Sequence, residues 1–266
     1  MKRLAAYIEG VGLLAPAINH WAEGKAILSS TAAYLPEKTR YPAVGALPAT
    51  ERRRTGQVVK LALSVGLEAV AHAGQEADDL PAVFASSGGD TVNCHSICET
   101  LASDDRSISP TRFHNSVTNA PAGYWSIATG SMAPSTVVCA FNASFGAGLL
   151  EVLSQVVVGD CRTVLIAYDQ PYPEPLHRAR PIIDGFGVGW VLTPQRTEQS
   201  LYAVEVALTQ DSAHVCSDPA LEALRKGCPA ARVLPALQVM ACNEAGRVVL
   251  DYLDTSQISL TLTPCH

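Results

Sequence analysis

The stretch PSTVVCAFNASFGAGLLEVLSQVVVGDCRTVLIAY, residues 134–168, decides the fold. Residues 135–141 are mostly apolar and rich in β-branched side chains, which predicts a strand, and residues 162–168 predict another for the same reason. Between them, residues 143–158 have the spacing of a helix that is apolar on most of its surface, so we expect a buried central helix. Its small and polar residues fall on one stripe: Ser144, Gly148, Glu151 and Gln155.

Two glycines in this helix, Gly146 and Gly148, each cost about 1 kcal/mol of helix stability relative to alanine. They indicate either that another backbone approaches closely or that glycine is simply tolerated there. We leave both interpretations open from the sequence alone.

Extended apolar segments alternate with helical ones along the rest of the chain, which predicts a layered α/β fold with a largely buried sheet. Further strands are expected at residues 4–9, 80–86, 184–192, 202–209, 248–253 and 258–262. Further helices are expected at residues 50–73, 92–102, 219–226 and 231–241. Gly74 is placed to cap the first of these helices. No Gly/Pro/Ser-rich linker or repeat divides the chain, so we expect a single domain over residues 1–266.

Composition narrows the class of protein. The chain has 266 residues, 48% of them hydrophobic and 17% charged, with a formal net charge of −6. This balance predicts a globular protein and argues against binding to nucleic acid, which needs a basic surplus. The apolar N-terminal run is interrupted by Glu9 and by glycines, so we expect a first strand there, no signal peptide and no membrane span. A cytoplasmic location follows as the expectation.

The eight cysteines are scattered without a paired CxxC spacing, which favours free thiols in a reducing compartment. Cys94, His95 and Cys98 could share one helix face, but a zinc site needs further ligands that the nearby sequence does not offer. The alternative is a helix with small buried residues. We expect no metal and no cofactor.

Residues 134–160 resemble the region around the nucleophile of condensing enzymes, the ketosynthases: an apolar strand, a catalytic cysteine on a tight turn, a glycine-containing helix and a terminal Gly-Asp. Aligned on its two ends, the segment has Asn142 where those enzymes have the cysteine. The resemblance extends over residues 1–210, with 211–266 as a reduced C-terminal part. It implies a truncated thiolase-like fold, with a mixed five-stranded type of sheet around a buried helix.

The resemblance also implies which chemistry is missing. A ketosynthase takes an acyl chain onto a thiolate at the positive end of the following helix, and an asparagine amide cannot form that thioester. The family uses two histidines from its second half, whereas here only His177, His214 and His266 follow the helix. His214 follows a strand, as the first family histidine does, but its neighbours SAHVC do not match, and the second histidine motif is absent.

A ketosynthase-like chain without the nucleophile resembles a chain length factor, and residues 114–130 (HNSVTNAPAGYWSIATG) look most like the short factors of aryl polyene pathways. The resemblance implies a heterodimer with an active β-ketoacyl synthase, indirect contact with an acyl carrier protein, and no catalysis by this chain. The strand at residues 135–141 would pair antiparallel with its counterpart in the partner. Residues implied to line the tunnel or the dimer interface are Thr118, Asn119, Ala122, Val138, Cys139, Phe141 and Asn142.

Asn142 has three interpretations: it caps the N-terminus of the helix, lines a pocket, or polarises a carbonyl as a residual decarboxylase. Cys139 lies three residues before Asn142 in an apolar strand, where we expect burial and a raised thiol pKa. An active acyltransferase or thioesterase that uses Ser144 or Ser116 is an alternative, although no GxSxG motif supports it. A structural homodimer of the same fold is another.

Two remaining motifs have a structural and a functional interpretation. The arginines at 52–54 either contact an acidic carrier protein or form a solvated helix start. The alternating glycines of DGFGVGWVL, residues 184–192, lack the GxGxxG spacing of a dinucleotide site, so we expect no nucleotide there.

Overall fold

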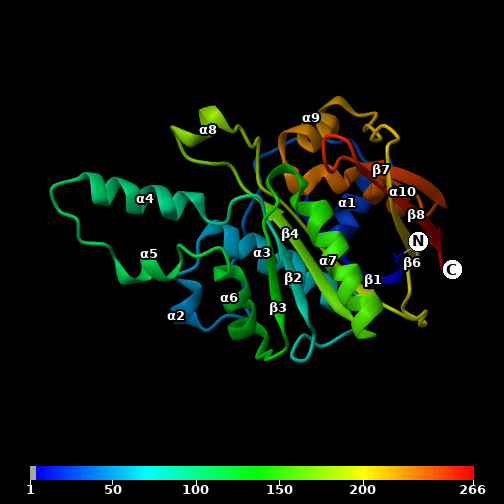
Figure 1. The fold of residues 1–266 in the computed structure, drawn as a ribbon, viewed down its shortest axis with the longest axis horizontal. Helices are drawn as coiled ribbons and strands as arrows, with labels where there is room; N and C mark the ends of the chain where they lie inside the picture. The colour runs from blue at the N-terminus through cyan, green and yellow to red at the C-terminus, as the bar shows by residue number, and fades with distance from the viewer. Residues whose placement is uncertain (1–3) are drawn as a thin grey trace.

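The computed structural model describes residues 4–266, and all of its named strands belong to one mixed sheet (Figure 1). The strand order is β3-β2-β4-β5-β1-β6-β8-β7, with β2 parallel to both β3 and β4 and every other pair antiparallel. The bounds are β1 Leu4–Leu14, β2 Ala82–Ala85, β3 Ser135–Val138, β4 Thr163–Asp169, β5 Phe186–Thr193, β6 Tyr202–Thr209, β7 Gly246–Leu250 and β8 Gln257–Pro264. The layered mixed α/β fold is confirmed, although the sheet has eight strands rather than five.

The α-helices are α1 Trp21–Leu28, α2 Ala49–Arg52, α3 Gln57–His72, α4 Thr91–Ala102, α5 Pro110–His114, α6 Ala120–Thr129, α7 Ser144–Gly159, α8 Leu176–Ala179, α9 Pro219–Gly227 and α10 Leu234–Ala241. Two 3₁₀ helices, η1 Phe141–Ala143 and η2 Pro229–Val233, precede α7 and α10. The helix expected at residues 50–73 is therefore divided into α2 and α3. The strand expected at 135–141 ends early, at Val138, and Gly74 follows α3 with a φ of +62°, as a helix-ending glycine does.

Each face of the sheet has its own hydrophobic core. On one face, α3 and α6 pack through a cluster that includes Leu61, Val65 and Trp125. On the other face, α7, α1, η2 and α10 pack through a second cluster that includes Phe145 and Trp190, whose rings meet edge to face at 5.8 Å. The sheet is thus covered on both faces, which is why most of its strands are almost wholly apolar.

Close packing of α3 on the sheet explains the alternating glycines of β5. A Cβ on Gly189 would lie 2.3 Å from the Val65 carbonyl oxygen, and one on Gly187 would lie 2.9 Å from Leu61. Gly12 of β1 meets the same carbonyl, at 2.1 Å. These glycines therefore allow the backbone of α3 to approach the sheet, and the motif has a packing role.

Helix α7 is buried along one side and exposed along the other, so the prediction of burial on most sides is too broad. Its C-terminal Val158 is 85% exposed. Added Cβ atoms on Gly148 and Gly146 would lie 2.6 Å from Ala85 and from Tyr252, so the close neighbours are side chains rather than another backbone. Residues 141–159 are long and apolar enough to cross a membrane by length and composition, but half of this stretch is buried within the fold, as in a core helix.

Helices α4 and α5 project from the body of the molecule, as Figure 1 shows. No residue of α4 is buried, so the expectation of a helix with small buried residues around Cys94, His95 and Cys98 is wrong. The Cys94 thiol lies 3.6 Å from the Ser116 carbonyl, and His95 lies 3.2 Å from Glu99. Within residues 4–266, no group of three metal-ligating side chains comes together.

Candidate functional site

The turn between β3 and α7 is a strained corner. After β3 ends at Val138, Phe141 has a φ of +52°, and the chain then forms η1 before α7 begins at Ser144. A left-handed conformation at a bulky residue is an outlier that costs about 1–3 kcal/mol. Such strain persists only where the surrounding structure holds it, so the contacts of this turn matter for function.

Ser144 ties the turn together. Its hydroxyl accepts a hydrogen bond from the Ala140 N–H at 3.0 Å and donates one to the Phe141 carbonyl at 2.8 Å. The N-cap position of α7 is Ala143, which has no capping side chain, so the predicted capping role of Asn142 is wrong. The interpretation of Asn142 as the N-cap fails because a 3₁₀ turn lies between the strand and the helix and moves the N-cap position by one residue.

Arg180, from the segment that follows α8, covers this corner. Its Nη2 donates to the Asn142 side-chain oxygen at 3.0 Å, and its guanidinium carbon lies 3.6 Å from the centre of the Phe141 ring. The Tyr172 ring lies 5.7 Å from the same carbon. The Nε and Nη1 atoms of Arg180 are shielded from solvent without a hydrogen-bond partner. Sequence reasoning missed this residue, since nothing in its local motif connects it with a turn 38 residues earlier.

A cavity of about 770 Å³ opens in front of the corner, lined by η1, by Arg232 of η2 and by the loop between β7 and β8. Asn142 lines this cavity, as one of its interpretations required. Burial lowers the pKa of the Arg232 guanidinium. The loop contributes two carboxylates, Asp251 and Asp254, so the cavity has charges of both signs.

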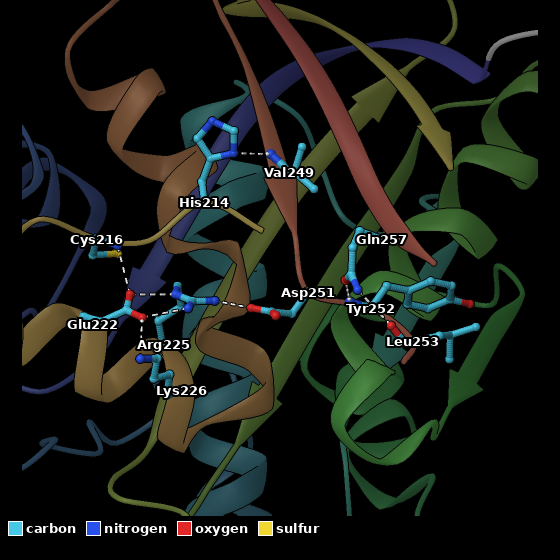
Figure 2. A network of polar contacts seen from close by, with 10 residues as sticks. All are labelled: His214, Cys216, Glu222, Arg225, Lys226, Val249, Asp251, Tyr252, Leu253 and Gln257. Carbon is cyan, nitrogen blue, oxygen red and sulfur yellow. Dashed lines mark hydrogen bonds and ion pairs between the residues drawn. The ribbon is translucent and has the colours of Figure 1, made fainter. Parts of the chain in front are cut away.

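An ion-pair network, shown in Figure 2, holds Asp251 at the start of the loop that lines the cavity. Arg225 bonds Glu222 at 2.7 Å and also contacts Asp251, which places the start of the loop. The hydrogen bond from Arg225 lowers the pKa of Glu222 to about 2. Within the loop, the Tyr252 N–H donates to Gln257 at 2.7 Å.

The histidines do not assemble at this site. His214 lies on the outer side of β7 (Figure 2). Its ring Nδ1 accepts a hydrogen bond from the Val249 N–H at 3.0 Å, and its backbone N–H donates to the Val249 carbonyl at 2.8 Å. His177 lies in α8, and His266 lines a different cavity beside His72. No histidine among residues 4–266 lines the cavity at Asn142.

The predicted tunnel and interface residues fall into two groups. Val138, Cys139, Phe141 and Asn142 lie at the β3–α7 corner. Thr118 and Asn119 are exposed just before α6, and Asn119 lines an apolar groove of about 500 Å³ that includes Phe113, Val117 and Ile127. Ala122 is only 7% exposed and belongs to the core cluster under α6, so it packs inside this chain.

Cys139 is exposed, which corrects the expectation of burial. The strand ends one residue before it and lies at the edge of the sheet, so no neighbouring strand covers the thiol. Partial desolvation and the Asp169 carboxylate raise its pKa, in the expected direction. The hydroxyl of Ser144 is used within the turn, and that of Ser116 donates to the Phe113 carbonyl, so neither candidate nucleophile contacts a histidine.

Strand β3 has a single neighbour, β2, and its other edge is open in the described chain. Exposed apolar side chains occur close to β3 in the chain and on α5. They include Met132 at 94%, three residues before the strand, Phe141 at 65%, three residues after it, and Phe113 of α5 at 68%. An open edge beside exposed apolar side chains is the arrangement that another chain can cover.

The family model described as "Beta-ketoacyl synthase, N-terminal domain" matches residues 25–242, which is most of the chain. The chain belongs to the β-ketoacyl synthase family. No curated protein matches the sequence.

Several solved structures share the fold. The structure of a ketosynthase (ApeO) in complex with its chain length factor (ApeC) from Xenorhabdus doucetiae matches with a TM-score of 0.74 and 22% identity, over 97% of this chain and 99% of that chain. The ishigamide ketosynthase/chain length factor matches with a TM-score of 0.73 and 15% identity, over 98% of this chain and 100% of that chain. A beta-ketoacyl synthase from Burkholderia phymatum STM815 gives 0.70 and 12% over the full length of both.

Proposed function

We propose that this protein is a non-catalytic chain length factor, which forms a heterodimer with an active β-ketoacyl synthase in the cytoplasm and shapes the cavity that holds the growing acyl chain. The proposed pathway is a fatty-acid- or polyketide-like one, of the aryl polyene type. Two of the structures with the same fold are titled as ketosynthase and chain length factor assemblies, which supports the choice. An acyl carrier protein would reach the complex through the partner.

The observation that carries the proposal is the open edge of β3. The carbonyl groups of Pro134 and Val138 point to β2, so alternation along the strand turns the N–H and C=O of Ser135 and Val137 outward. A strand from a partner can add to this edge antiparallel and extend the sheet. The exposed Phe113 and Met132 would be buried at the same interface.

The corner after β3 supports the non-catalytic part of the proposal. Residues 140–143 read Ala-Phe-Asn-Ala, with neither a thiol nor a hydroxyl. Because no histidine lines the adjoining cavity in the described chain, the groups that would activate a nucleophile or stabilise a malonyl thioester carbonyl are missing there.

Co-expression tests the proposal. The chain is produced alone and together with a β-ketoacyl synthase from the same organism. The molar mass of each purified species is measured by light scattering after size-exclusion chromatography. We expect a one-to-one complex that elongates acyl thioesters. A stable homodimer that does not bind the synthase would support the structural homodimer instead.

Activity of the complex separates the roles of the two subunits. Asn142→Ala in this chain should leave condensation largely intact, whereas replacing the cysteine of the partner should abolish it. Loss of all condensation in an assembled complex with Asn142→Ala would contradict a non-catalytic role.

Product length tests the proposed tunnel. Thr118→Phe is the preferred variant, because Thr118 is exposed and a larger side chain there need not disturb the fold. We expect shorter products from the Thr118→Phe complex. Ala122→Phe is a poorer test, since Ala122 is buried in the core of this chain and the substitution would overpack it.

A further inference from the structure

We propose that Phe141, rather than Asn142, occupies the nucleophile position of this chain, and that Arg180 holds the Phe141 ring in place. The inference deepens the proposed function, because a phenyl ring has no nucleophilic atom that could accept an acyl group.

Backbone geometry points to Phe141. In enzymes that present a nucleophile on a strand-to-helix corner, the reactive residue is the one in the strained conformation, since the sharp turn exposes its side chain. Between β3 and α7, the only described residue with a positive φ is Phe141, at +52°. Asn142 lies inside η1, and its amide oxygen is already bonded to Arg180. Alignment by sequence is off by one residue here because spacing does not reveal which residue takes the strain.

The contacts of Arg180 hold the corner in its strained conformation. Its guanidinium lies 3.6 Å above the Phe141 ring and bonds Asn142 at 3.0 Å, so the arginine holds two consecutive residues of the turn. Its Nε and Nη1 atoms are shielded from solvent without a hydrogen-bond partner, so the guanidinium is itself held against the protein at this corner.

The same surroundings would activate a thiol placed at the corner. Helix α7 begins without a capping side chain, which leaves the positive end of its dipole uncompensated, and Arg180 adds a full positive charge. The carboxylates near the corner are Asp251, which is paired with Arg225, Asp254, and Asp169, which raises the pKa of the neighbouring Cys139 thiol and opposes the effect of Arg180. The proposal therefore predicts that Phe141→Cys creates a reactive thiol and that Asn142→Cys does not.

Alkylation with iodoacetamide tests this prediction on the full chain, both alone and in the complex with the synthase. The thiolate sulfur attacks the methylene carbon, the C–S bond forms as the C–I bond breaks, iodide leaves with the electron pair, and the thiol proton passes to the buffer. Peptide mapping by mass spectrometry follows each cysteine separately. The exposed Cys98 and Cys242 serve as internal references.

We expect Cys at position 141 to react at least about 10-fold faster at pH 7 than Cys at position 142 or the reference cysteines. Adding Arg180→Met to Phe141→Cys should remove most of the advantage. Faster reaction at position 142, or a rate at 141 that does not respond to Arg180, would overturn the proposal. The rates measured on the isolated chain do not depend on assembly, so failure to bind a synthase would overturn the proposed function and leave this result unchanged.

A second measurement needs no thiol. Phe141→Gly and Phe141→Ala both remove the ring, but only glycine relieves the strain of a positive φ, so the glycine variant should melt about 2–4 °C higher. At position 142 the order should reverse, with Asn142→Ala above Asn142→Gly. The same order at both positions would place the strain elsewhere and overturn the assignment.

Discussion

At one edge of the sheet, β7 is covered by the segment that precedes α9, whereas at the other edge β3 has no neighbour in the described chain. His214 takes up both outward backbone groups of Val249. Beside it, Arg247 of β7 pairs with Asp211 at 2.6 Å, so a charge also guards that edge. The residues of β3 are Ser-Thr-Val-Val, with no charge, proline or bulge.

Proteins protect exposed strand edges because unpaired backbone groups recruit other chains. This chain protects the β7 edge with its own residues and leaves the β3 edge unprotected. Under the proposed function, we expect the β3 edge to pair with the partner and the β7 edge to face solvent in the complex.

The largest expected effect comes from blocking the open edge. Val137→Pro removes an outward N–H and places a ring where a partner strand would lie, while the bonds between β3 and β2 use other residues. We expect the affinity for the synthase to fall about 100-fold, which corresponds to about 3 kcal/mol. Titration of the labelled synthase by fluorescence anisotropy measures it.

Val137→Ala is the matched control, because it trims the side chain but keeps the N–H. It should weaken the complex far less than proline does. Equal losses from both variants would show that the side chain, not the backbone edge, makes the contact.

The buried carboxylate of Asp169 links the end of β2 to η2, and its ionisation should make the stability of the fold depend on pH. Its carboxylate accepts from the Ser87 N–H at 2.7 Å and from the Ala230 N–H at 2.9 Å. Burial raises its pKa from 3.8 to about 6, despite these bonds. A raised folded-state pKa means that the stability from this group is present below pH 3.8 and is lost as the pH rises through 6.

One pKa unit corresponds to about 1.4 kcal/mol, so ionisation of Asp169 should lower the free energy of unfolding by about 3 kcal/mol in full, and by about 2 kcal/mol between pH 4.5 and pH 7. Glu222, with its pKa near 2, stays ionised in the folded protein over this window, so it contributes only through its titration in the unfolded chain, a smaller change of the opposite sign. Urea unfolding at both pH values measures the change. Asp169→Asn should have a flatter dependence, and an unchanged slope in that variant would assign the effect to other groups.

The layered fold could be predicted from sequence because its signals are local. The apolar runs that became β4 and β6 and the periodic segment that became α7 differ from their predicted bounds by one residue or less. The alternating glycines of β5 were rightly separated from a nucleotide motif, but their contact with α3 depends on a segment more than a hundred residues earlier in the chain.

The position of the candidate site could be predicted from the sequence, but its conformation and contacts could not. Spacing placed the turn after β3, but it could not show that Phe141 takes the strain or that Arg180 covers it. Cys139 was assigned to the interior because its neighbours are apolar, yet an apolar strand at a sheet edge leaves side chains exposed. Whether a strand is central or at the edge is set by its partners, which local pattern does not encode.

The smallest predicted effect concerns the protected edge. His214→Ala leaves the buried Val249 N–H without an acceptor, which should lower the free energy of unfolding by about 1–2 kcal/mol in urea titrations. His214→Asn should restore much of the lost stability, because the asparagine side-chain oxygen can replace Nδ1 as the acceptor. Arg247→Ala, which removes an exposed ion pair, should lower the free energy of unfolding by less than about 1 kcal/mol. None of the three should weaken the complex with the synthase. If His214→Ala dissociates the complex while the unfolding free energy is unchanged, β7 is an interface as well, and the contrast between the two edges fails.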